Sequence, residues 1–171
     1  MRALIVYESM FGNTEAVAKA VAGGMAPEVS AKVVNVDDAP GDLAEFDLLV
    51  VGGPTHVHGM SRPATRKSAA EQAKDGVCSR GGVREWIASL KPVPAGLLAV
   101  TFDTRLDKPR WLVGSAAAGA AKALERRHVR IICKPESFFV TTAEPPALAG
   151  GERERAWGWG TAIAAEMTAK P

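Results

Sequence analysis

The sequence reads Tyr7-Glu8-Ser9-Met10-Phe11-Gly12-Asn13-Thr14-Glu15 at the point where an apolar run gives way to a helical pattern. The apolar run, residues 3–7, is short, continuous and β-rich, which predicts a buried strand. Residues 16–25 place apolar side chains at helical spacing, which predicts an amphipathic helix that begins near Asn13 or Thr14. The quoted stretch is therefore the turn of a strand–helix unit.

This turn has the chemistry of an anion site. Ser9, Asn13 and Thr14 offer neutral donors, and Gly12 lets a ligand approach the backbone. The start of the following helix adds unpaired N–H groups and the positive end of the helix dipole. A phosphate suits such a pocket, although an ordinary polar cap on a strand–helix turn would use the same residue types.

The pattern Ile5-Val6-Tyr7-x-Ser9-x-x-Gly12-x-Thr14-x-x-x-Ala18 resembles, position for position, the signature of the flavodoxin-like family. In that family this loop binds the phosphate of FMN. The resemblance implies that FMN is the cofactor and that its phosphate is bound by Ser9, Met10, Phe11, Gly12, Asn13 and Thr14.

The rest of the chain alternates apolar strands with helical patterns, without internal repeats or a linker. Further strands are expected at residues 31–36, 48–52, 97–102 and 129–140, the last interrupted by Pro135, and further helices at 63–73, 83–90, 115–127 and 152–169. Gly23-Gly24 and Pro27 are expected to end the first helix. This alternation predicts an α/β fold in one domain, residues 1–171: a flavodoxin-like, doubly wound parallel sheet of five strands, order 2-1-3-4-5, with helices on both faces.

In flavodoxins the loops after strands three and four pack against the two faces of the flavin ring. The resemblance assigns these roles to Pro54, Thr55, His56, Val57, His58 and Gly59, and to Phe102, Asp103, Thr104 and Arg105. The usual Trp and Tyr are missing from the first loop, so His56, His58 or Met60 would cover that face. Trp111 would cover the other face or anchor a helix in the core, and we favour the core.

Other features of these loops have weaker implications. Gly59 is a place where a peptide could reorient towards the flavin. His56 and His58 lack a nearby Cys or carboxylate and make a poor metal site. The polar piece Lys74–Gly82 is expected to be a mobile surface loop or a flap over the site.

Composition and charge limit the compartment and the kinds of binding partner that the chain can have. The chain has 171 residues and a net charge of +2, without an apolar run long enough to span a bilayer, which predicts a cytoplasmic protein. Cys78 and Cys133 are expected to be free thiols, Cys133 in a strand. Bases gather in residues 105–134, which form either a solvated face or a docking patch for an acidic partner. No recognition motif for nucleic acid accompanies them.

The leading hypothesis is an FMN-binding carrier of electrons between redox-partner proteins, for which the chain needs no catalytic residues of its own. The alternative on the same fold is an FMN-dependent oxidoreductase, either a quinone reductase or a flavodoxin-type protoporphyrinogen oxidase. A flavodoxin-like scaffold that has lost its cofactor is a third possibility.

Overall fold

The structure, a computed structural model, describes residues 1–73 and 76–169. Strands and helices alternate along the chain as the sequence predicts. In order, the elements are β1 Arg2–Tyr7, α1 Asn13–Met25, β2 Ser30–Asn35, the 3₁₀ turn η1 Val36–Asp38, β3 Leu48–His56, β4 Gly59–Met60, α2 Pro63–Gln72, α3 Val83–Ser89, β5 Leu98–Leu106, α4 Arg110–Val113, α5 Ala116–Glu125, β6 Arg130–Ile131, β7 Glu136–Val140 and α6 Glu152–Thr168.

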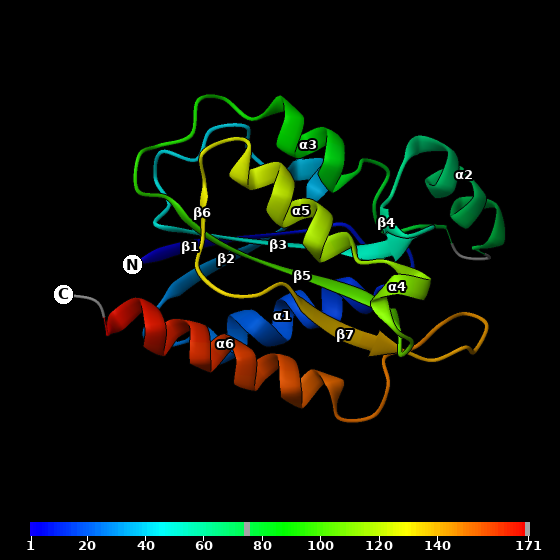
Figure 1. Ribbon diagram of the computed structural model, residues 1–171. Coiled ribbons are helices and arrows are strands. Elements are labelled where there is room, and N and C mark those ends of the chain that lie inside the picture. The colour runs from blue at the N-terminus through cyan, green and yellow to red at the C-terminus, as the bar shows by residue number, and fades with distance from the viewer. Residues whose placement is uncertain (74–75, 170–171) are drawn as a thin grey trace.

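The sheet has the predicted doubly wound topology. Its main path runs β2-β1-β3-β5-β6, and β7 also pairs with β5, so that β6 and β7 are two pieces of the interrupted fifth strand. All these pairings are parallel. The carboxyl ends of the strands therefore share one edge, where β4, α2 and α4 also lie (Figure 1).

Side chains alternate across the sheet, which is why helices cover both faces. Ala3 and Ile5 of β1 pack with α1 and α6, whereas Leu4 and Val6 pack with α3 and α5. The period of two residues in a strand sends neighbouring side chains to opposite faces. Each face is apolar in β1, β3 and β5, as expected for a parallel sheet buried on both sides.

Helices α1 and α6 lie so close that glycine is required at their contact. A Cβ built on Gly24 would lie 1.9 Å from the Trp157 carbonyl oxygen, and one on Gly160 would lie 2.2 Å from the Val21 carbonyl oxygen. α1 continues through Gly23-Gly24 to Met25, so the glycines do not end the helix, whereas Pro27 follows its C-cap as expected. These glycines serve helix packing rather than helix termination.

Replacing Gly160 with alanine is expected to lower the free energy of unfolding by about 2 kcal/mol, because the added methyl group forces the two helices apart. Gly158→Ala in the same helix is the matched control, since its Cβ would meet no atom within 4 Å. The control should gain about 0.5–1 kcal/mol from helix propensity. Equal urea-unfolding free energies for the two variants would contradict this packing.

The structure corrects several expected boundaries. Strand β3 runs to His56 and β5 runs to Leu106, so the loops predicted to start at Gly53 and Asp103 begin later. Both strands are lengthened by pairing to each other through Pro54 and Thr104. Cys133 was expected in a strand but lies in the break between β6 and β7.

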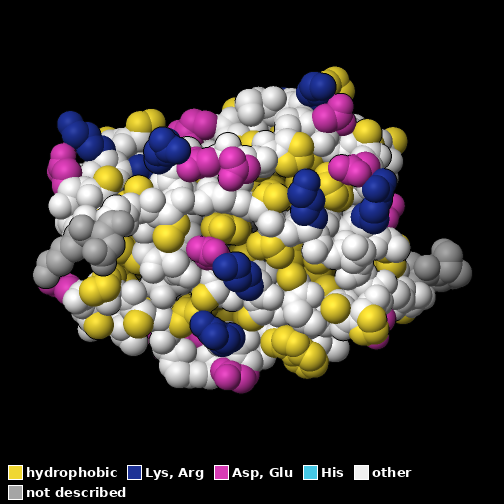
Figure 2. Space-filling model, turned by 180° about the vertical axis from the view of Figure 1, so that it is seen from behind, with side chains coloured by type: hydrophobic (Ala, Val, Ile, Leu, Met, Phe, Trp, Pro, Cys, Tyr) yellow, Lys and Arg dark blue, Asp and Glu magenta, His cyan; other side chains and the backbone are white. Residues whose placement is uncertain are grey.

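Charge is mixed on the surface. On the face shown in Figure 2, Lys and Arg side chains are interspersed with Asp and Glu, and no patch of one sign forms. Within residues 1–73 and 76–169, none of the helices has both the length and the hydropathy that crossing a bilayer requires.

Candidate functional site: loops at the carboxyl edge of the sheet

The loop between β1 and α1 leaves backbone donors open to a ligand. Gly12 has a φ of 86°, in the left-handed region, and caps α1 without a side-chain hydrogen bond. Its amide donates to Ser9 Oγ at 3.0 Å. The remaining amides of the loop and first helical turn donate to no acceptor among the described residues: Met10, Phe11, Asn13, Thr14 and Glu15. Such an array of amides at a helix start suits an anion.

The polar side chains of this loop also form hydrogen bonds within the protein. Ser9 accepts a bond within the loop, Thr14 Oγ1 lies 2.8 Å from Thr104 Oγ1, and Asn13 Nδ2 donates to the Pro146 carbonyl oxygen at 2.8 Å. These groups were expected to face a phosphate. They also fix the loop to its neighbours, and Ser9 Oγ, which accepts from the Gly12 amide, keeps its own proton to donate, so an anion would meet this hydroxyl as well as the backbone amides.

Helix α5 also starts at this edge, but a buried carboxylate already occupies its N-terminus. Asp103 Oδ2 accepts from Ser115 Oγ at 2.6 Å, Ala117 N at 3.0 Å and Thr55 Oγ1 at 3.2 Å. Thr55 Oγ1 in turn accepts from Ala116 N at 2.9 Å. The amides of α5 are therefore satisfied within the protein, in contrast to those of α1.

The loop after β3 is a hairpin with a strained tip. His56 pairs with Gly59, and the two residues between them, Val57 and His58, have φ values of 41° and 71°. Positive φ at both positions is typical of a type I′ turn, which favours Asn-Gly. A β-branched residue is rarely found there, and such strain concentrates at functional sites. Gly59, expected as the adaptable position, has no positive φ.

Replacing Val57-His58 with Asn-Gly is expected to raise the free energy of unfolding by about 1–2 kcal/mol, because both residues then suit the turn. His128→Gly is the control, since His128 has a φ of 64° in the turn between α5 and β6, away from this edge. It should gain about 0.5–1 kcal/mol. Chemical denaturation measures both gains, and a loss of stability in the Asn-Gly variant would refute the strain.

The hairpin meets the segment after α4. His58 forms a bridge with Gly114, whose added Cβ would lie 2.1 Å from the His58 carbonyl oxygen. Next to this contact the apolar side chains are unusually exposed: 80% for Val57, 83% for Trp111 and 46% for Leu112. The preference for Trp111 in the core is therefore wrong. An exposed apolar rim of this kind marks an interaction site.

The four residues expected after strand four lie inside β5 and are buried. Phe102 is fully buried, and its ring contacts Phe138 and Trp159 edge-on in the core. Arg105 donates to Ser137 Oγ at 3.0 Å and to the Lys108 carbonyl, which turns its charge towards β7. Together with Asp103 and Thr104, these residues support the loops from behind, and their side chains do not line a ligand surface.

The remaining hairpin residues are half-buried. Pro54, Thr55 and His56 belong to the extended end of β3. Burial lowers the pKa of His56, and the Arg66 guanidinium lowers it further. A histidine with a lowered pKa is neutral near pH 7, so His56 presents an uncharged imidazole at this edge.

The segment 78–81 was expected to be part of a mobile loop or a flap, but it is hydrogen-bonded to the loop between β1 and α1. Ser79 N donates to the Ser9 carbonyl at 2.9 Å, and Ser9 N donates to Ser79 Oγ at 2.9 Å. Asp37 fixes the segment by accepting from Arg80 N at 2.9 Å and Gly81 N at 2.6 Å. Lys74 and Asp75 lie outside the described residues. Ser79 could not be identified from the sequence, because no local motif indicates a contact with a residue 70 positions away.

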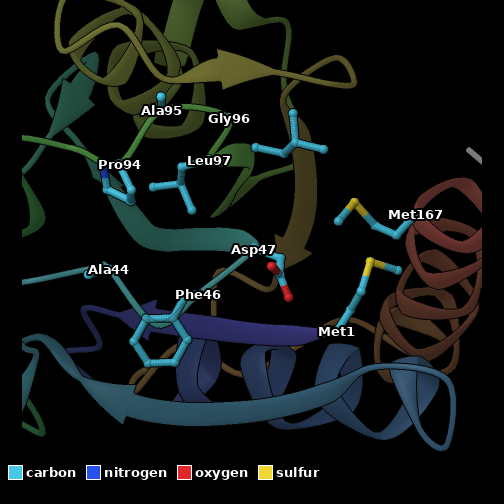
Figure 3. Close-up of a pocket in the computed structure, with 10 residues that line it drawn as sticks. Met1, Ala44, Phe46, Asp47, Pro94, Ala95, Gly96, Leu97 and Met167 are labelled. Atoms are coloured by element: carbon cyan, nitrogen blue, oxygen red, sulfur yellow. The ribbon is translucent and has the colours of Figure 1, made fainter. Parts of the chain in front are cut away.

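A separate cavity of about 350 Å³ lies at the opposite edge of the sheet, where Met1, Phe46, Leu97 and Met167 surround Asp47 (Figure 3). Asp47 Oδ2 accepts from the Arg2 amide at 2.8 Å. The lining offers no cluster of donors or bases comparable with the loops at the carboxyl edge.

Comparison with known proteins agrees with this geometry. The sequence model of the flavodoxin family matches residues 5–85, from β1 to α3, including the anion-binding loop and the hairpin. A solved flavodoxin from the domain Archaea superposes with a TM-score of 0.67, covering 98% of this chain and 99% of that one at 19% identity. The chain has the flavodoxin-like fold. No curated protein sequence matches it.

Two further flavodoxins share the fold. Oxidised flavodoxin 1 from Bacillus cereus has a TM-score of 0.65 at 17% identity, over 97% of this chain and 98% of that one. Two-electron reduced flavodoxin from Megasphaera elsdenii has a TM-score of 0.60 at 16% identity, over 95% and 98%. The flavodoxin-like fold thus spans almost the whole chain, although identity this low establishes the fold alone.

Proposed function

We propose that this flavodoxin-like chain binds FMN and carries electrons between redox-partner proteins. The observation that carries the proposal is the uncapped start of α1, where Gly12 and the free amides of residues 10–15 form a cradle for a dianion. The loop has no Lys or Arg, so the cradle fits a phosphate bound by neutral donors. The residues present therefore fit the phosphate end of FMN.

The chain's own residues bind and orient the cofactor. Backbone amides of the cradle bind the phosphate, and the hairpin tip with Trp111 provides apolar surface for a flat ring. The neutral His56 adds no charge beside that ring. FMN supplies the redox chemistry when bound, and the protein tunes it.

The proposed partner is an acidic redox protein. Only some of the bases in residues 105–134 lie where such a partner would dock. Lys108 and Arg110 are exposed at the carboxyl edge beside Trp111. Arg130 pairs in register with Leu98 at the opposite edge, and Arg105 is buried. The bases that adjoin the proposed flavin rim are therefore Lys108 and Arg110, around an apolar tip suited to docking.

Titration of the purified chain with FMN tests the proposal. We expect quenched flavin fluorescence, a shifted absorbance band and a stoichiometry of one FMN per chain, followed by stepwise reduction with dithionite. Unchanged fluorescence and absorbance at FMN concentrations well above those of the protein would overturn it. Steady turnover of NADPH with a quinone would instead support an FMN-dependent oxidoreductase.

A further inference from the structure

Glu8 is a buried carboxylic acid that directly precedes the anion cradle in the chain, with its carboxyl group against the start of α3. It follows β1, directly precedes Ser9, and is 1% exposed. Its Oε2 accepts from the Val83 amide at 3.0 Å, while Oε1 makes no hydrogen bond of regular geometry among the described residues, although the Ser61 hydroxyl lies close enough to lower the pKa of the carboxyl group. A buried carboxylate oxygen without a partner is costly, and protonation removes most of that cost.

The charges around Glu8 are committed to other groups. From α2, Arg66 donates to Ser61 Oγ at 2.8 Å and pairs with Glu85 of α3 at 3.2 Å. Arg84 of α3 donates to the carbonyls of Met60 and Ser61. Burial raises the pKa of Glu8, as does the Glu85 charge; Ser61, the Val83 amide and Arg66 offset only part of this. Glu8 thus keeps its proton to higher pH than an exposed glutamate.

The neighbouring cradle is the place where a second negative charge would arrive. Met10 and Phe11, whose amides are free, follow Glu8 within three positions of the chain. A dianion there and a carboxylate at the buried Glu8 repel each other, and a nearby like charge favours the neutral acid.

We propose that Glu8 is a proton-binding site coupled to the cradle: it takes up a proton from solvent when the phosphate group of FMN binds. This inference rests on the proposed function. The proton adds to a Glu8 carboxylate oxygen, and no electron or other group is transferred. Consequently the affinity for FMN falls as pH rises through the interval between the Glu8 pKa values of the free and bound protein.

Isothermal titration calorimetry in buffers of different ionisation enthalpy counts the protons taken up with FMN. The wild type should take up more protons per FMN than Glu8→Gln, and this difference cancels the titration of the FMN phosphate itself. Glu85→Gln is the matched control, because it removes a more exposed carboxylate from the same cluster and leaves Glu8 in place. It should still take up a proton with FMN, over a lower pH interval, because the Glu85 charge no longer raises the pKa of Glu8. Riboflavin, which lacks the phosphate, should show no difference between wild type and Glu8→Gln.

The size of the effect follows from linkage. Each unit by which the bound phosphate raises the Glu8 pKa corresponds to about a tenfold loss of FMN affinity above the titration interval, and Glu8→Gln should escape that loss. Equal proton uptake by wild type and Glu8→Gln, with FMN bound by both, would overturn the inference and leave the proposed function standing. Absence of FMN binding by the wild type would overturn both.

Infrared spectroscopy of the wild type gives a second readout should Glu8→Gln fail to fold. Adding FMN at a pH where Glu8 is ionised should produce a protonated-carboxyl band from ¹³C-labelled glutamate. An unchanged carboxyl region on FMN binding would count against the proposal.

Discussion

Gly12→Val is expected to weaken FMN binding by about tenfold to a hundredfold. Gly12 has a φ of 86° at the start of α1, a conformation that costs a β-branched residue a few kcal/mol. The loop would relax to a negative φ and turn the cradle amides away from a common centre. Since a Cβ at Gly12 meets no atom within 4 Å, the fold itself should survive.

Gly41→Val is the matched control for this variant. Gly41 has neither a positive φ nor an atom within 4 Å of its added Cβ. Its FMN dissociation constant, measured by fluorescence quenching, should equal that of the wild type. A Gly12→Val protein that binds FMN as tightly as this control would show that the cradle geometry is irrelevant to binding.

Gly114→Ala is expected to have the second large effect, both on stability and on flavin affinity. Its methyl group would lie 2.1 Å from the His58 carbonyl oxygen, and Gly114 itself has a φ of 76°. Separating the hairpin from the segment after α4 should cost about 1–3 kcal/mol in the free energy of unfolding. The displaced rim should also weaken FMN binding by about tenfold or more.

Gly119→Ala, five residues further on and within α5, is the matched control for Gly114→Ala. Its Cβ would lie 3.4 Å from the flexible end of Met60, so we expect a neutral or slightly stabilising change and unaltered FMN affinity. Thermal unfolding and flavin titration compare the two variants. If Gly114→Ala retains both the melting temperature and the affinity of Gly119→Ala, the hairpin contact is unimportant.

The parts of the fold set by local pattern could be predicted from the sequence. The run Ala3–Tyr7 and the helical spacing after it place a strand–turn–helix correctly, and the loop between them is where backbone donors are open. The order of the sheet follows from alternation and right-handed crossovers. These features depend on residues that are close together in the sequence, so the local pattern is enough to predict them.

The supporting contacts could not be predicted in the same way. Ser79 contacts Ser9 across 70 residues of the chain, and Asp103 binds Thr55 from the end of β3 and Ser115 from the start of α5. Trp111 was misplaced because its residue type favours burial, whereas the short helix α4 presents it to solvent. Glu8, a charged residue directly after an apolar strand, is a local sequence signal of an unusual environment.

The central claim is that backbone amides at the start of α1 bind a phosphate ester. Dissociation constants for FMN and riboflavin, measured on the same protein by fluorescence quenching, test it most directly, because the two ligands differ only in the phosphate. We expect FMN to bind at least about a hundredfold more tightly, as several charge-assisted hydrogen bonds imply. Equal affinities, or no binding of either ligand, would contradict the claim.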